Sequence, residues 1–150
     1  MLAVSFNGAL GHAGLLIMLA GSVTGALSTA LAIRTGNTRG LRQAPNYAWV
    51  IALGSLVAVL AMQLALHQRD FSLKYIQQVG SHTTPPLYNV AAMWSALEGS
   101  ILLWVAVLAG FTAAVAWRFR RRSTDHLVGW ALVVMFVVCL FFFFLMVDAA

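Results

Sequence analysis

The sequence predicts an all-α integral membrane protein with four transmembrane helices. Of its 150 residues, 61% are apolar and only 9% are charged, whereas a soluble domain carries about 25% charged residues. Four apolar stretches each exceed the roughly 18 to 20 residues that cross a bilayer as a helix. This composition excludes a soluble enzyme and a free nucleic-acid-binding domain. The predicted helices of this single membrane domain, 1–150, span about residues 8–33, 46–66, 89–117 and 127–147.

The first two predicted helices carry small residues at the spacing typical of close helix packing. Gly21 and Gly25 lie four residues apart in the first stretch, and Gly54 and Ala58 repeat that spacing in the second. Small side chains let two backbones approach closely where no hydrophobic effect drives association. No cation precedes the first stretch and three arginines follow it, which is the reverse of a secretory signal peptide. We therefore expect it to be a retained helix.

The third predicted helix follows a long outer loop, residues 67–88. Thr84 and Pro85 fit the N-cap and first position of a helix, which favours a helix entry at the end of this loop. The alternative is a docking surface for an outer partner, which would include His82 and Tyr88. The fourth predicted helix carries four consecutive phenylalanines, 141–144, which we expect to face lipid. Its Cys139 is the only cysteine of the chain, which excludes a disulfide or a thiolate metal site.

Basic residues are concentrated in two of the three connections. The connections 34–45 and 118–126 hold seven of the nine lysines and arginines, and the loop 67–88 holds Arg69 and Lys74. The positive-inside rule places the arginine-rich connections in the cytoplasm. The predicted topology is therefore N-out/C-out in the inner (plasma) membrane, with both termini and the loop 67–88 in the periplasm. The basic connections also attract anionic lipid of the bilayer.

Glu98 is the most informative polar residue, because it is the only acid inside a predicted helix. It lies about nine residues from the outer end, or roughly 13 Å deep, where a charge costs about 2.5–3.5 kcal/mol. Three roles remain open: a packing contact with a hydroxyl or backbone group, proton or ligand handling, and a contact with a cofactor or partner. Trp94 shares its helical face, and Gly99 permits close approach of another backbone.

The histidines do not form a haem or metal site by themselves. Only His12 lies in a predicted helix, and a haem held by two histidines inside a helical bundle needs ligands from two facing helices. We therefore expect no metal site, and no haem bound by this chain alone. A further hypothesis is that His12 and Glu98 approach each other, because both lie toward the outer half of the membrane.

The segment Phe71–Thr112 resembles the N-terminal region of the CcmF family of cytochrome c-type biogenesis proteins. Its core is Trp94–Trp104, with the sequence WSALEGSILLW, and Leu10–His12 resembles the opening of the family. Two positions depart from the family pattern: Ser95 replaces a glycine, and Leu97 stands where histidine is frequent. The resemblance implies that this chain belongs to the membrane core of the haem lyase, the enzyme that attaches haem to apocytochrome c.

The resemblance also implies what this chain does not supply. The haem-binding segment of the family is a tryptophan-rich outer loop flanked by ligand histidines, and these 150 residues do not contain it. We therefore expect a scaffold without catalytic residues, either one chain of a split protein or a truncated one. Glu98, Trp94 and Trp104 would contact the remaining haem-lyase part, which carries the tryptophan-rich loop. A haem chaperone and apocytochrome c would be partners through the complex.

A protein of another class remains as the alternative. A small proton-coupled transporter of four helices would fit the length of the chain, with Glu98 as its proton-exchange site. A transporter function would not explain the motif at Trp94–Trp104.

Overall fold

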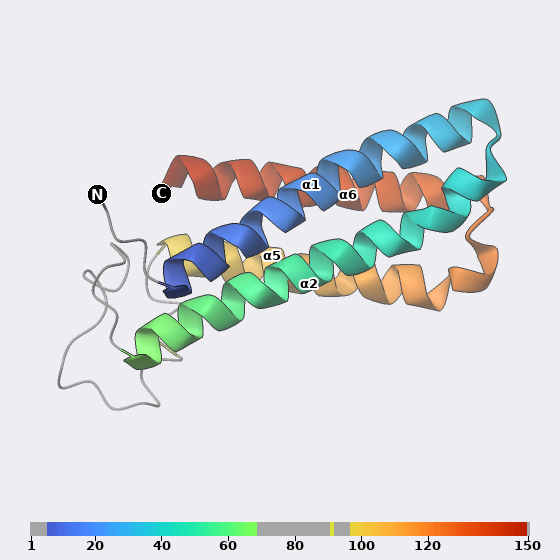
Figure 1. Cartoon of the computed structure of the whole chain (residues 1–150). Helices are drawn as coiled ribbons and strands as arrows, with labels where there is room; N and C mark the ends of the chain where they lie inside the picture. The colour runs from blue at the N-terminus through green and yellow to red at the C-terminus, as the bar shows by residue number, and fades with distance from the viewer. Residues whose placement is uncertain (1–5, 69–90, 92–96, 150) are drawn as a thin grey trace.

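The computed structural model describes residues 6–68, 91 and 97–149, and these form a bundle of four long helices (Figure 1). The helices are α1 (Phe6–Thr35), α2 (Thr38–Gln68), α5 (Leu97–Arg118) and α6 (His126–Ala149). A short 3-10 helix, η1 (Arg120–Arg122), lies between α5 and α6. Each long helix contains an apolar segment long enough to cross a membrane. The predicted fold class, four apolar helices, is confirmed within the described part of the chain.

The bounds of the helices differ from the predicted ones mainly at α2. The predicted helix starts at about residue 46, after the hydrophilic connection 34–45, whereas α2 begins at Thr38 and carries Pro45 inside it. Proline lacks the backbone N–H group, so it removes one hydrogen bond of the helix, and neighbouring helices make such a loss tolerable. The first two residues of the expected outer loop 67–88 belong to α2. The remainder of that loop, together with 89–96 except Ala91, lies outside the described residues.

The connection between α1 and α2 is a tight turn of two residues. Gly36 has a φ of 66°, and its N–H group donates to the carbonyl oxygen of Ile33 at 3.4 Å, while Asn37 N donates to Ala32 O at 2.9 Å. This pair of bonds is a Schellman motif, which ends a helix with glycine in the left-handed conformation. The Asn37 Oδ1 atom then accepts from the N–H groups of Arg39 and Gly40 and caps α2. One short turn therefore reverses the chain direction.

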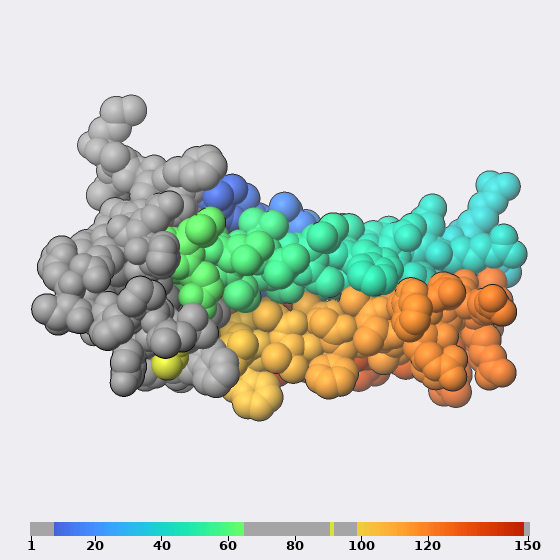
Figure 2. Space-filling view, turned by 90° about the horizontal axis from the view of Figure 1, so that it is seen from below, coloured from blue at the N-terminus to red at the C-terminus, as the bar shows by residue number. Residues whose placement is uncertain are grey.

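The helices occupy the corners of the bundle so that α1 and α5 lie diagonally opposite. Helix α1 packs against α2 and α6, and α5 packs against the same two helices. Figure 2 shows α2 and α5 side by side along the length of the bundle, with bulky side chains of α5 projecting away from α2. Both turns, α1 to α2 and α5 to α6, lie at one end, and the first residues of α1 and the last residues of α6 lie at the other (Figure 1).

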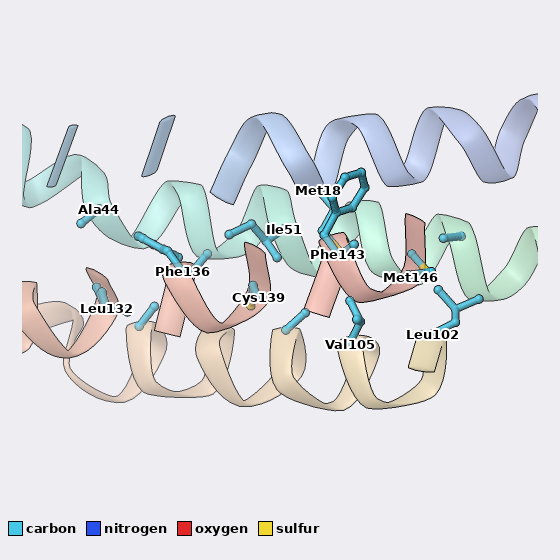
Figure 3. Close-up of a cluster of buried hydrophobic side chains, with 14 of the residues drawn as sticks. Met18, Ala44, Ile51, Leu102, Val105, Leu132, Phe136, Cys139, Phe143 and Met146 are labelled. Atoms are coloured by element: carbon cyan, nitrogen blue, oxygen red, sulfur yellow. The ribbon is translucent and has the colours of Figure 1, made fainter. Parts of the chain in front are cut away.

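The core lies between α6 and the three other helices (Figure 3). Phe136 of α6 is fully buried and lies against the surface of α1 at Gly25. Side chains from all four helices complete the cluster: Met18, Ile51, Leu102, Val105, Leu132, Cys139, Phe143 and Met146.

The run of phenylalanines in α6 divides between core and surface. Phe141 and Phe144 are 58% and 59% exposed, as expected for side chains that face lipid, but Phe143 is only 7% exposed and belongs to the core. The expectation that the whole run faces lipid was wrong for Phe143. Four consecutive residues of an α-helix cover more than one full turn, so one of them must point toward the neighbouring helices.

Candidate functional site

The segment around Glu98 opens α5, and the structure describes only its later residues. Glu98 belongs to the first turn of α5, but its side chain lies outside the described part, as do Trp94, His82 and Tyr88. Gly99 is buried. The predicted juxtaposition of Glu98 and Trp94 therefore stays a prediction.

Trp104 lies on the outward side of α5. Its side chain is 60% exposed, and Phe111 and Arg118 follow at intervals of seven residues, also exposed. Residues seven apart lie on nearly the same side of an α-helix. The opposite side of α5 carries the buried Leu102 and Val105. Trp104 is therefore available to a lipid or to another helix rather than used in the core of this bundle.

His12 lies near the start of α1 and faces outward. Its Nδ1 atom is 2.7 Å from the carbonyl oxygen of Gly8, one turn earlier. Because a carbonyl oxygen only accepts, Nδ1 carries the proton in this contact and Nε2 is left as the acceptor. The Glu98 side chain lies outside the described residues, so the approach of His12 and Glu98 stays a prediction.

The two histidines whose side chains are described do not fit a shared haem. His12 is near the first turn of α1, whereas His126 begins α6 at the end where α1 finishes. Helix α1 rises 1.5 Å per residue, so the two histidines are about 30 Å apart along the bundle. Among the side chains that the structure describes, no group of three His, Cys, Asp or Glu residues is placed to hold a metal ion.

Buried hydroxyl groups form polar contacts that the sequence did not single out. Thr112 Oγ1 donates to Leu108 O at 2.8 Å and lies 4.0 Å from Cys139 Sγ, so it joins α5 to α6. Tyr47 donates to Ser28 Oγ at 3.3 Å and joins α2 to α1. The signal available in the sequence is a hydroxyl residue within an apolar run. Contacts of this kind fix the relative position of helices, and they supply no reactive group.

The arginines of the described chain gather at the end of the bundle that contains both turns. Arg34, Arg39 and Arg42 flank the turn between α1 and α2. Arg118 ends α5 and three more arginines follow it, and all seven are exposed. The predicted segregation of positive charge to one side is therefore present in the fold. The end that carries Phe6 and Ala149 has no described lysine or arginine.

These features define a multi-pass helical membrane protein whose described positive charges lie at one end. No profile of a known protein family matches the chain, but individual proteins do. It is 33% identical over 106 residues to the cytochrome c-type biogenesis protein CcmF of Escherichia coli K12, which is 71% of this chain and 16% of that protein. It is 30% identical over 141 residues to CycK of Rhizobium meliloti 1021, which is 93% of this chain and 21% of that protein.

The arrangement of the helices agrees with a solved structure as well. The cytochrome c haem lyase CcmF superposes on 97% of this chain with a TM-score of 0.86 and 33% identity, and the match covers 24% of that chain. The chain belongs to the CcmF family of cytochrome c-type biogenesis proteins, and it spans about a fifth of the length of the relatives it matches.

Proposed function

We propose that this chain is a membrane subunit or part of a haem lyase for cytochrome c maturation, and that it scaffolds haem-binding helices supplied by another part of the complex. The observation that carries the proposal is the TM-score of 0.86 to the haem lyase CcmF over 97% of the chain. Shared sequence and shared helix arrangement favour this function over a proton-coupled transporter.

The chain contributes structure and no haem ligand of its own in this proposal. The separation of His12 and His126 supports it, because these two described histidines are too far apart to bind one haem together. Haem is a substrate of the complex, where thioether bonds form between its vinyl groups and cysteine thiols of apocytochrome c. The tryptophan-rich loop and its histidines come from the remaining haem-lyase part, and a haem chaperone and apocytochrome c bind through the complex.

The outward side of α5 around Trp104 is the proposed contact with those further helices. Trp104 supports this assignment, because a large aromatic side chain is exposed on a helix whose other face is already packed. Aromatic residues are frequent at the centres of helix and protein interfaces. Glu98 and Trp94 are proposed for the same contact, because they belong with Trp104 to the motif Trp94–Trp104.

The proposed orientation places the arginine-rich end in the cytoplasm and both chain ends outside the inner membrane. Seven arginines at one end support it through the positive-inside rule. The loop 67–88, with His82 and Tyr88, would then face the periplasm and the partners there. Cysteines introduced at Asn37 and at Asp148, each in a Cys139→Ala background, test this. A membrane-impermeant maleimide added to intact cells should label position 148 and leave position 37 unlabelled.

Co-purification tests the function itself. The tagged full chain is expressed alone and together with a haem-lyase chain that carries the tryptophan-rich loop. We expect co-purification in detergent, and cytochrome c haem attachment that depends on both chains. Expressed alone, the chain should show no Soret absorption at one haem per chain. One haem per isolated chain would contradict the scaffold role, and proton-coupled uptake lost in Glu98→Gln would instead support a transporter.

A further inference from the structure

The turn between α5 and α6 forms two adjoining hollows that share the same two arginines. One hollow, of about 430 Å³, is lined by Trp117, Arg118, Arg120 and Arg121. The other, of about 270 Å³, is lined by Arg118, Phe119, Arg121 and Arg122. Arg118 and Arg121 therefore border both hollows. The 3-10 helix η1 brings this about, because its tight winding holds three consecutive arginines beside the end of α5.

Two other charged groups of the turn, Arg120 and Asp125, are engaged in local contacts. The Arg120 guanidinium lies 5.0 Å from the centroid of the Trp117 ring, a cation–π contact, and its Nη1 atom donates to Trp117 O at 3.5 Å. The nearest acidic residue along the chain, Asp125, accepts from Leu127 N at 3.0 Å and caps α6. The Arg118 guanidinium lies 5.9 Å from the centroid of the Phe119 ring, a cation–π contact that leaves its charge in place. None of these contacts neutralises Arg118 or Arg121, so this pair presents positive charge to an outside anion.

The face of α5 below these arginines is apolar and continuous with them. Arg118 lies seven residues after Phe111 and fourteen after Trp104, and all three are exposed. They follow one side of the helix, because a spacing of seven residues is nearly two full turns. An anion held at Arg118 would therefore have an apolar strip of α5 directly beneath it. A free anion makes no use of such a strip, whereas the acyl chain of a phospholipid does.

We propose that Arg118 and Arg121 bind the phosphate of an anionic phospholipid headgroup, and that one acyl chain of this lipid lies along Phe111, nearer to the turn than the assembly contact proposed at Trp104. This site goes beyond the scaffold function and does not depend on it. Guanidinium groups suit phosphate because their planar set of N–H donors can bind two oxygens at once. Trp117 and Phe119 are exposed beside them, as is typical of aromatic residues at the level of the headgroups.

A titration of the full chain in detergent tests the site. Phosphatidylglycerol with brominated acyl chains quenches tryptophan fluorescence on binding, and brominated phosphatidylcholine serves as the neutral reference. We expect the native chain to bind the anionic lipid more tightly, and the R118Q/R121Q variant to bind it roughly thirtyfold more weakly, since each arginine near a lipid surface contributes about 1 kcal/mol. The control variant R34Q/R39Q removes equal charge from the same end of the bundle. Its affinity for phosphatidylglycerol should stay within about threefold of that of the native chain if contacts at the turn contribute more than the overall positive charge of this end.

Three further results decide between sources of binding. Equal losses in the two variants would overturn the site, because charge at that end would then act only as a diffuse field. Displacement of the lipid by inorganic phosphate at the same concentration would also overturn it, because the ligand would then be a free anion. The R118K/R121K variant keeps both charges and should recover affinity to within about fivefold of the native chain. Failure to recover, with helical content unchanged by circular dichroism, would contradict the proposal.

Discussion

Gly14 of α1 and Gly54 of α2 lie against each other with their backbones in contact. A Cβ atom on Gly14 would lie 2.7 Å from the carbonyl oxygen of Gly54, and one on Gly54 would lie 2.8 Å from the carbonyl oxygen of Gly14. The close approach continues along α1, where Gly21 faces Ile51 and Gly25 faces Tyr47. Lipid tails are as apolar as side chains, so packing of this kind, rather than the hydrophobic effect, holds such helices together.

Replacing Gly14 by alanine should therefore destabilise the bundle, although alanine is the better helix former. The added methyl group would meet the backbone at Gly54 O and Ala58 N, which cannot rotate away. Overpacking of this kind costs about 1–3 kcal/mol. Reversible unfolding in mixed micelles of detergent and SDS measures the change.

Gly110→Ala provides the matched control on α5. A Cβ atom at Gly110 has no heavy atom within 4 Å, so alanine should be neutral or stabilise the helix by up to about 1 kcal/mol. Equal effects of the two substitutions would show that contact between α1 and α2 at Gly14 does not stabilise the bundle.

Phe136→Ala should be the most damaging truncation in α6. Its ring is fully buried, and it lies about 3 Å from the position of a Cβ atom on Gly25. Loss of a buried phenylalanine ring costs about 3–5 kcal/mol when the cavity does not collapse. Phe141→Ala removes the same group from an exposed position on the same helix, so its effect should stay within about 0.5 kcal/mol. Thermal unfolding in detergent, followed by circular dichroism, compares the two.

Cys139 provides a reporter of core opening, because it is the only cysteine and its side chain is fully buried. A maleimide should modify it slowly in the folded chain and fast in SDS, since labelling requires separation of α5 from α6. Gly14→Ala should raise the labelling rate and Gly110→Ala should not. The rate is measured by the mass shift of the intact chain. Fast labelling of the native chain would contradict the packing of Cys139 against Thr112.

The cap at Asn37 should stabilise the turn between α1 and α2. Asn37→Ala removes the oxygen that accepts from the N–H groups of Arg39 and Gly40, and loss of such a cap costs about 1 kcal/mol. Asn37→Ser keeps an acceptor and should be nearly neutral. Hydrogen exchange of the first amides of α2, followed by mass spectrometry, reads out fraying directly. Unchanged exchange in Asn37→Ala would show that the side chain does not hold this end.

The number of helices and the position of the basic turns could be predicted from the sequence, because both depend on composition. Apolar segments of sufficient length are visible in the chain, and the arginines of 34–45 and 118–126 necessarily meet at one end when successive helices alternate in direction. The start of α2 at Thr38 could not be predicted, because 34–45 is hydrophilic and contains Pro45. Whether a proline ends a helix depends on how neighbouring helices tolerate one missing hydrogen bond.

The contacts between helices were less predictable, because they depend on how each helix is rotated. The spacing of Gly21 and Gly25 indicated a packing face, but Gly14 lies outside that pair and only the fold places it against Gly54. The burial of Phe143 was not predicted either, because it depends on how α6 is rotated. At the candidate site, the motif pointed to Glu98 and Trp104 by resemblance. Composition and spacing alone do not distinguish Trp104 from the other aromatic residues that face lipid.

Trp104→Ala should separate folding from assembly. The side chain is largely exposed, and it leaves the core of the bundle intact, so the isolated chain should lose less than about 0.5 kcal/mol of stability. If α5 contacts further helices of the haem lyase there, loss of an aromatic residue at the centre of that contact should weaken co-purification by roughly tenfold or more. Trp130→Ala on α6 is the matched control, because Trp130 is also exposed but lies on another helix, near the arginine-rich end. Quantitative co-purification with the haem-lyase partner measures both variants. An equal loss of co-purification in both variants would mean that Trp104 acts only through its contact with lipid. That result would contradict assembly through the outward side of α5.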